Sequence, residues 1–279
     1  METSSPTSGE KPLIIACTVP PQEEFIKAIA GNETRVLVMV PPGASPHTFE
    51  PTPSQISALE SADLYIALGS GIEFENQWLD RIRSMYPHLQ IVNSSTGLIL
   101  MPGTEDHHKS EEHEETHEAE TTDPHIWMSI KNAKLMVNTT CEALSTHTPS
   151  KRIFYETNRN RYLDLLSVVD TKIAGLLSSL PSRTILVYHP AFGYFCRDYN
   201  LTQLAVESDG KEPAANSLAS LVDRAKSEKI SLLFTEPEFS TQGAETLAAE
   251  IGARVVLITP LSGEYLTNIN HIAEQIAGK

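Results

Sequence analysis

The chain has 279 residues, of which 40% are hydrophobic, so it is long enough for one large or two medium domains with real cores. Its formal net charge of -15 argues against nucleic acid as a partner, because phosphate binding requires a basic face, and it favours cationic ligands. Its three cysteines, an odd number without CxxC spacing, indicate buried free thiols, and no apolar run reaches the ~18 residues of a membrane-spanning helix.

Residues 1–11 (METSSPTSGEK) are polar and small. They predict a flexible N-terminal tether whose upstream signal segment is absent from this sequence. An ordinary disordered N-terminus is the alternative interpretation.

Residues 12–147 alternate short β-branched runs with helical patterns, which indicates a parallel sheet with crossover helices. The expected strands are residues 13–18, 35–40, 64–68 and 90–93. The expected helices are residues 23–30, 53–62, 74–85 and 130–145. We interpret this region as an N-terminal α/β lobe.

A long helix is predicted over residues 148–181. Thr148, Pro149 and Ser150 give a cap followed by proline in the first turn, no further proline occurs before Pro181, and apolar residues recur at helical spacing. Some 30 residues at about 1.5 Å each make a helix of roughly 45 Å. A helix of that length is expected to link two lobes.

Residues 182–279 repeat the alternation and predict a C-terminal α/β lobe. The expected strands are residues 184–188, 201–206, 231–235 and 254–258. The expected helices are residues 190–198, 214–228, 241–251 and 265–277. The fold class predicted is α/β, with two lobes that each contain a mainly parallel sheet flanked by helices and that are joined by one rigid linker helix.

The most informative stretch is residues 105–125, which holds five of the ten histidines and nine carboxylates against one lysine. Imidazole nitrogens and carboxylate oxygens bind borderline divalent cations such as Zn²⁺. A run this poor in apolar residues cannot build a core, so residues 103–122 are expected to form a mobile loop. A solvated loop without a role is the alternative. Its candidate auxiliary metal ligands are His107, His108, His113 and His117.

Three further histidines stand next to prolines at the ends of predicted elements. His47 follows a strand in Ser45-Pro46-His47, His189 directly follows another strand and precedes Pro190, and His125 ends Asp123-Pro124-His125. Ligands of open α/β sheets bind outside the carboxyl ends of strands, so these three side chains could converge on one metal. Separate solvent-facing histidines are the alternative.

The chain resembles the metal-binding receptors of ABC importers for zinc and manganese, a family that includes zinc receptors with a His-rich loop. The resemblance covers essentially the whole chain from Lys11. It is carried by GASPHTFEPTPSQ (43–55), DPHIWMS (123–129), YHPAFGYFCRDYNL (188–201), TEPEFS (235–240) and TPLSGEYLTNINH (259–271). It implies two α/β lobes joined by a rigid helix, with the metal held in the cleft between them.

By this resemblance, His47 and His125 would be ligands from the N-terminal lobe and His189 a ligand from the C-terminal lobe. The aspartate that usually supplies the fourth ligand is replaced by Thr259. A water molecule is the first choice for the fourth position, and Glu236 is an alternative ligand or a partner of the ligating imidazoles. Neither a catalytic residue nor an organic cofactor is expected.

Three imidazoles without a certain carboxylate favour Zn²⁺ over Mn²⁺, which prefers oxygen ligands. The expected function is therefore extracytoplasmic capture of zinc and its delivery to a membrane permease and ATPase, by a monomer that is tethered or lipid-anchored in the periplasm or at the cell surface. A manganese receptor of the same family is an alternative. A metal store or adhesin-like receptor without transport is another. A three-histidine zinc hydrolase is also open.

Overall fold

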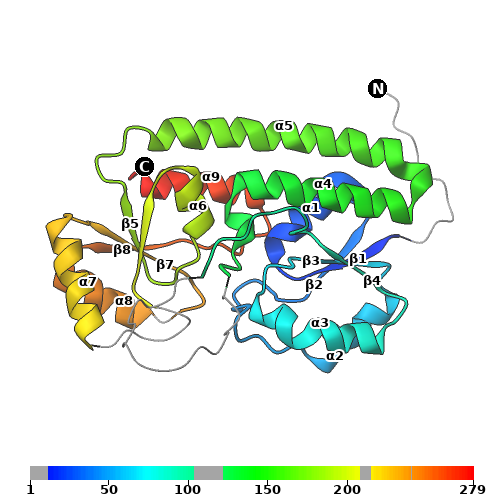
Figure 1. Cartoon of the computed structure of the whole chain (residues 1–279), viewed down its shortest axis with the longest axis horizontal. Coiled ribbons are helices and arrows are strands. Elements are labelled where there is room, and N and C mark those ends of the chain that lie inside the picture. Colours follow the sequence, from blue (N-terminus) through cyan, green and yellow to red (C-terminus); the bar gives the residue numbers. More distant parts are fainter. Residues whose placement is uncertain (1–11, 104–121, 208–214, 240) are drawn as a thin grey trace, which may run out of the picture.

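The computed structural model describes residues 12–103, 122–207, 215–239 and 241–279. It contains two four-stranded parallel sheets, placed side by side along the molecule (Figure 1). The first has the order β2-β1-β3-β4 and the second the order β6-β5-β7-β8, so both halves use the same strand order. Their strands are β1 (Ile14–Cys17), β2 (Arg35–Val38), β3 (Leu64–Ala67), β4 (Gln90–Asn93), β5 (Thr184–Val187), β6 (Thr202–Ala205), β7 (Leu232–Thr235) and β8 (Arg254–Leu257). The predicted fold class is confirmed.

Helices connect the strands and cover the sheets. They are α1 (Pro20–Ala30), α2 (Pro53–Ala58), α3 (Glu73–Met85), α4 (Ile130–His147), α5 (Arg152–Leu177), α6 (Gly193–Asp198), α7 (Ala215–Ser227), α8 (Thr241–Ile251) and α9 (Tyr265–Ile276). Single 3-10 turns occupy Leu59–Ser61, Ile126–Met128 and Pro149–Lys151. None of the helices in the described ranges is both long and apolar enough to cross a membrane.

Helix α5 is shorter than the sequence indicated. A 3-10 turn occupies Pro149–Lys151, so the α-helix starts at Arg152 and has 26 residues, or about 39 Å at 1.5 Å per residue. It ends before Pro181, which has no N–H to donate to the carbonyl of Leu177, and the guanidinium of Arg183 donates to that carbonyl instead, at 2.6 Å. The helix still runs along nearly the whole molecule (Figure 1).

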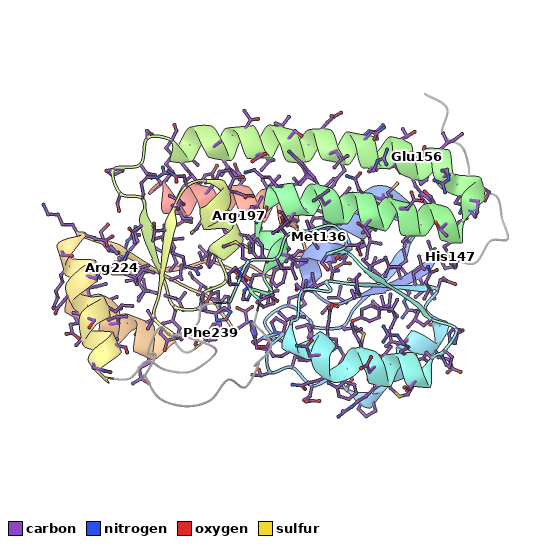
Figure 2. The ribbon with its side chains drawn as sticks, in the orientation of Figure 1. Met136, His147, Glu156, Arg197, Arg224 and Phe239 are labelled. Atoms are coloured by element: carbon purple, nitrogen blue, oxygen red, sulfur yellow. The ribbon has the colours of Figure 1, made fainter. Side chains whose placement is uncertain are left out.

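One face of α5 lies on both halves of the protein. Its buried side chains recur at intervals of seven and four residues, as expected for one stripe of a helix, and they are Tyr155, Tyr162, Leu166, Ile173 and Leu177. The helix packs against α1 and α4 of the first half and against α9 of the second half. A single apolar cluster therefore contains residues from both halves, including Met136 of α4, which is labelled in Figure 2.

Hydrogen bonds also join the two halves. The indole N–H of Trp127 donates to the carbonyl of Pro260, and the hydroxyl of Tyr265 donates to the carbonyl of Trp127, both at 2.9 Å. The Tyr162 hydroxyl of α5 donates to Glu24 of α1 at 2.6 Å, and the same carboxylate accepts the N–H of Leu266. These bonds fix how the two sheets face one another. The lobe boundaries inferred from the sequence stay predictions.

The neighbouring residues Leu165 and Leu166 give a matched test of this packing. Leu166 is fully buried and Leu165 is 47% exposed. We expect Leu166→Ala to lower the free energy of unfolding by about 2–5 kcal/mol, since a cavity is left in the shared core. Leu165→Ala should change it by only about 0.5 kcal/mol. Urea denaturation of the two variants tests this, and equal losses would contradict the proposed role of the α5 stripe.

Candidate metal centre

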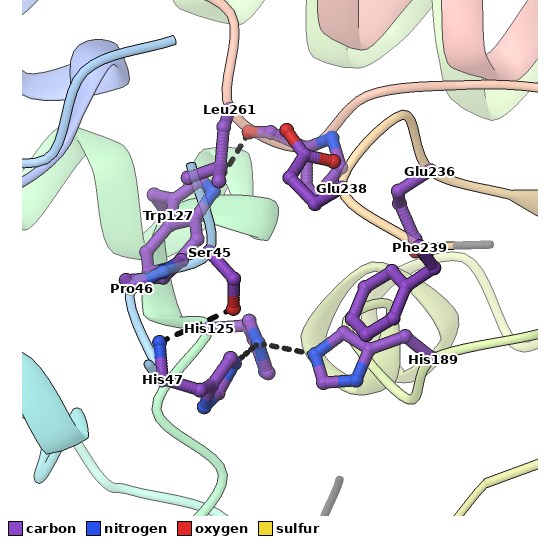
Figure 3. Close-up of a pocket in the computed structure, with 11 residues that line it drawn as sticks. Ser45, Pro46, His47, His125, Trp127, His189, Glu236, Glu238, Phe239 and Leu261 are labelled. Carbon is purple, nitrogen blue, oxygen red and sulfur yellow. Dashed lines mark hydrogen bonds between the residues drawn. The ribbon is translucent and has the colours of Figure 1, made fainter. Parts of the chain in front are cut away.

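Three histidines from separate segments of the chain lie close together in one pocket (Figure 3). His47 lies in the loop after β2, and His189 is the second residue after β5. His125 directly precedes the 3-10 turn that leads into α4. The three residues that the sequence singled out are thus brought together from segments far apart in the chain.

The three imidazoles converge through their Nε2 atoms. The Nε2 of His125 lies 3.2 Å from that of His47 and 3.1 Å from that of His189. The ligand atoms of the three residues all lie within 4.8 Å of one another, and this is the metal-ligand cluster found among the described residues. His125 and His189 are buried, and His47 is partly buried.

A carboxylate partners the other ring nitrogen of every histidine. The Nδ1 of His47 lies 2.7 Å from Glu73, and the Nδ1 of His125 lies 2.9 Å from Asp123. The Nδ1 of His189 is hydrogen-bonded to Glu207. An ionised carboxylate can only accept a hydrogen bond, so with these three carboxylates ionised each Nδ1 carries the proton and each Nε2 presents its lone pair to the centre. That is the tautomer that binds a cation.

Burial changes the pKa of His189 and of two of the carboxyl groups. Burial, together with the nearby imidazoles of His125 and His47, lowers the pKa of His189 to about 2. Burial also raises the pKa of Glu73, but the hydrogen bond and charge of His47 outweigh it, and the net pKa of this carboxyl is lowered. Burial raises the pKa of Glu207 to about 7. Converging neutral nitrogens backed by acidic groups form a site for a cation.

The support of His125 depends on a close approach between the two halves. Asp123 accepts hydrogen bonds from both the backbone N–H and the Nδ1 of His125 through one oxygen. Its other oxygen lies against Gly193 at the start of α6, where an added Cβ would be only 2.4 Å away. The hydroxyl of Tyr194 donates to the Asp123 carbonyl at 3.0 Å. Only glycine fits at position 193 without moving this aspartate.

Aromatic side chains hold two of the rings. Phe239 stacks on His189 with a centroid distance of 4.9 Å and an angle of 25°. Trp127 meets His125 edge-on at 5.4 Å. Both aromatic rings line the same pocket as the three histidines. They limit the rotation of the imidazoles and keep the nitrogens aimed at one point.

Glu236 lines this pocket as well, and it is 1% exposed. Neither of its carboxyl oxygens has a hydrogen-bond partner in the described part of the chain, and neither belongs to the cluster of converging ligand atoms. Burial, followed by the charges of Glu238 and Glu207, raises its pKa well above the ordinary value. In the view of Figure 3, Phe239 lies between Glu236 and His189. Thr259 uses its hydroxyl to accept the N–H of Leu261.

The three histidines were predicted from the sequence, but the three carboxylates behind them were not. Asp123 stands two residues before His125, so its spacing was a usable signal. Glu73 lies 26 residues from His47 and Glu207 lies 18 residues from His189, and only the folded chain brings these pairs together. The auxiliary candidates His107, His108, His113 and His117 lie outside the described residues.

Three imidazole nitrogens are a ligand set that suits Zn²⁺, which is commonly held by three histidines with a fourth position left for another ligand. Mn²⁺ prefers oxygen donors and binds nitrogen sites less tightly. The donor set therefore favours zinc among the two metals.

Comparisons with known proteins agree with this chemistry. Residues 15–279 match the model of the family described as zinc-uptake complex component A, periplasmic (ZnuA). The high-affinity zinc uptake system protein ZnuA of Bacillus subtilis (strain 168) is 31% identical over 264 residues, covering 93% of this chain and 82% of that protein. The zinc-binding lipoprotein AdcA of Streptococcus pneumoniae (serotype 4) is 28% identical, and the match covers 92% of this chain but only 52% of that longer protein.

Solved structures give the same result. A zinc-bound deletion mutant of ZnuA superposes with a TM-score of 0.87 and 34% identity, covering 96% of this chain and 97% of that one. A manganese-bound periplasmic metal-binding protein from Candidatus Liberibacter asiaticus has a TM-score of 0.82 at 17% identity, covering 95% and 98% of the two chains, which shows the shared fold alone.

Gly193→Ala tests the support of His125. The added methyl group would displace Asp123, so the imidazole of His125 loses its fixed orientation, and we expect the metal affinity to fall by about tenfold or more. Competition titration with a chromogenic chelator measures the change. Gly175→Ala is the matched control, because a Cβ at this α5 position meets nothing within 4 Å. Equal affinities of the two variants would contradict the role assigned to Gly193.

Proposed function

We propose a function from the premise that this chain belongs to the ZnuA family of periplasmic zinc-uptake components. It is an extracytoplasmic zinc-binding receptor that captures Zn²⁺ between its two halves and delivers it to the membrane permease of an ABC importer, which is driven by an ATPase. The observation that carries this proposal is the convergence of three Nε2 atoms within 4.8 Å, contributed by both halves of the chain.

His47, His125 and His189 are the proposed zinc ligands. Each has a carboxylate on its Nδ1, which raises the basicity of the ligating nitrogen and fixes its direction. For the fourth position we propose a water molecule, with Glu236 as the alternative ligand. The absence of Glu236 from the converging set supports the water.

Zinc is the proposed cargo rather than manganese. The ligand set holds three nitrogens and no carboxylate oxygen among the converging atoms, and the zinc-binding relatives share about a third of their residues with this chain. The family consists of solute-binding receptors rather than enzymes, and we propose that this chain carries out no chemical step. Zinc-dependent hydrolysis of an activated ester would contradict that part of the proposal.

The remaining parts of the proposal concern assembly and location. We propose that the receptor acts as a monomer, since both halves of the metal centre come from one chain. A lipid anchor or tether at the membrane would hold it near its permease, as the name of the S. pneumoniae relative describes for that lipoprotein. Sedimentation of the zinc-loaded protein tests the monomer, and a stable dimer would overturn it.

Removal of a ligand should abolish tight binding. We expect His47→Ala and His189→Ala to weaken zinc binding by orders of magnitude, because each removes one of three nitrogen donors and leaves its carboxylate partner without a proton donor. Titration of the metal-free protein with Zn²⁺ and Mn²⁺ against a competing chelator measures both affinities. His88→Ala is the control, since His88 lies outside the site, where it contacts the backbone carbonyl of Glu60 and the ring of Tyr86. Wild-type affinity in both variants would refute the site, and tighter binding of Mn²⁺ would reassign the cargo.

The His-rich segment is proposed to collect zinc at secondary, weaker sites. We expect deletion of residues 105–120 to lower the number of zinc ions bound while the tight site keeps its affinity, because the three proposed ligands lie outside the deleted segment. Isothermal titration calorimetry gives both numbers. If tight binding disappeared with the segment, this division of roles would be wrong.

A further inference from the structure

The first turn of α3 contacts the loop that carries His47. The carboxylate of Glu73 binds the Nδ1 of His47, and the backbone N–H of Phe74 donates to the carbonyl of Pro46, the residue before His47, at 3.1 Å. Glu75, in the same turn, is 4% exposed and contacts no histidine. Glu75 is therefore not one of the three carboxylates that support an imidazole directly.

Glu75 is fully engaged inside the protein. It accepts the backbone N–H groups of Leu68 and Gly69, at 2.6 and 2.8 Å, on its two separate oxygens. The hydroxyl of Thr18 donates to it as well. A carboxyl group buried without such donors would be strongly destabilising, so these bonds explain how it is tolerated. They also mean that Glu75 determines the path of the chain at the end of β3.

The turn after β3 is hydrogen-bonded to the segment that carries His125. Gly69 has a φ of +70°, and a Cβ there would lie 2.7 Å from the hydroxyl of Ser95, so the turn is tightly confined. The hydroxyl of the next residue, Ser70, donates to the carbonyl of Pro124 at 2.7 Å. In return, the hydroxyl of Thr122 donates to the carbonyl of Ser70 at 2.8 Å.

We propose that Glu75 is a positioning residue for the metal: it fixes Gly69 and Ser70, and Ser70 fixes the Asp123-Pro124-His125 segment. This inference rests on the proposed function of the three-histidine centre as a zinc site. It adds a buried acid that touches neither the metal nor a ligand, yet sets where one ligand stands. Together with Glu73, it makes a single helical turn responsible for both metal-binding loops of the first half.

The physical reason is the geometry of the ligand set. His125 is the central ring, since its Nε2 lies 3.1–3.2 Å from the other two. A small shift of its backbone moves it away from both neighbours at once. Loss of groups that orient metal ligands commonly weakens binding by about 10–100-fold.

The test compares Glu75→Gln with Ser70→Ala. A glutamine offers one acceptor oxygen in place of two, so the N–H of Leu68 or Gly69 loses its partner. Ser70→Ala removes the bond to Pro124 directly. We expect each variant to bind Zn²⁺ about tenfold more weakly in a chelator competition. The double variant should bind Zn²⁺ no more weakly than the single variant with the lower affinity, because both substitutions break the same chain of contacts.

Asp63→Asn is the matched control. Asp63 is also a carboxylate that holds a backbone N–H of the first sheet, that of Ile14 at 2.8 Å, but at the end of the sheet away from the metal. We expect this variant to lose stability in thermal unfolding and to keep its zinc affinity. The visible spectrum of the Co²⁺-loaded protein adds a direct readout of ligand geometry, which should change in Glu75→Gln and stay unchanged in Asp63→Asn.

The outcomes separate this inference from the proposed function. If the wild-type protein binds no zinc tightly, the proposed function fails. If the wild type binds tightly and Glu75→Gln and Ser70→Ala match it in affinity and Co²⁺ spectrum, the positioning role is overturned. Additive losses in the double variant would also overturn it. If Glu75→Gln does not fold, Ser70→Ala serves as the test. Wild-type zinc affinity in Ser70→Ala would then refute the positioning role.

Discussion

The constraint on which the rest of the structure depends is the close approach of three imidazole nitrogens at the junction of two sheets. Three imidazole nitrogens within 4.8 Å of one another can all bind one cation only if none of the facing atoms carries a proton. The protein meets this condition by placing a carboxylate behind every ring, so each proton sits on the outer nitrogen. The carboxylates thus orient the three rings, which reduces the cost of assembling the ligands.

This arrangement requires that the two halves keep their relative position. Helix α5 buries one stripe against helices of both halves, and a single apolar core continues from one sheet region to the other. Trp127 shows how closely the packing and the site are coupled. Its indole donates to Pro260 of the second half, while the same ring meets the edge of His125. Gly193 of the second half shows the same coupling, because its lack of a side chain leaves room for the carboxylate of Asp123 from the first half.

The acids of this chain serve different purposes according to their surroundings. Glu73 and Asp123 act on imidazoles directly, and Glu75 acts on the backbone that carries one of them. Glu236 is buried without a hydrogen-bond partner among the described residues, a costly state for a carboxyl group, and burial together with the charges of Glu238 and Glu207 raises its pKa.

The strand–helix alternation, the two-lobe fold class and the three candidate histidines could be predicted from the sequence, because these leave local signals: β-branched runs of four to six residues, helical spacing, and prolines next to His47, His125 and His189. The resemblance to metal receptors pointed to the same residues. Only the tertiary structure decided which groups stand behind each ring. Glu73, Glu207 and Glu75 act across 26, 18 and 6–7 residues of sequence, and nothing in their neighbourhood distinguishes them from the other acids of a chain with 36. Parallel sheets bring the ends of distant strands to one edge, so contacts at that edge are set by topology rather than by local sequence.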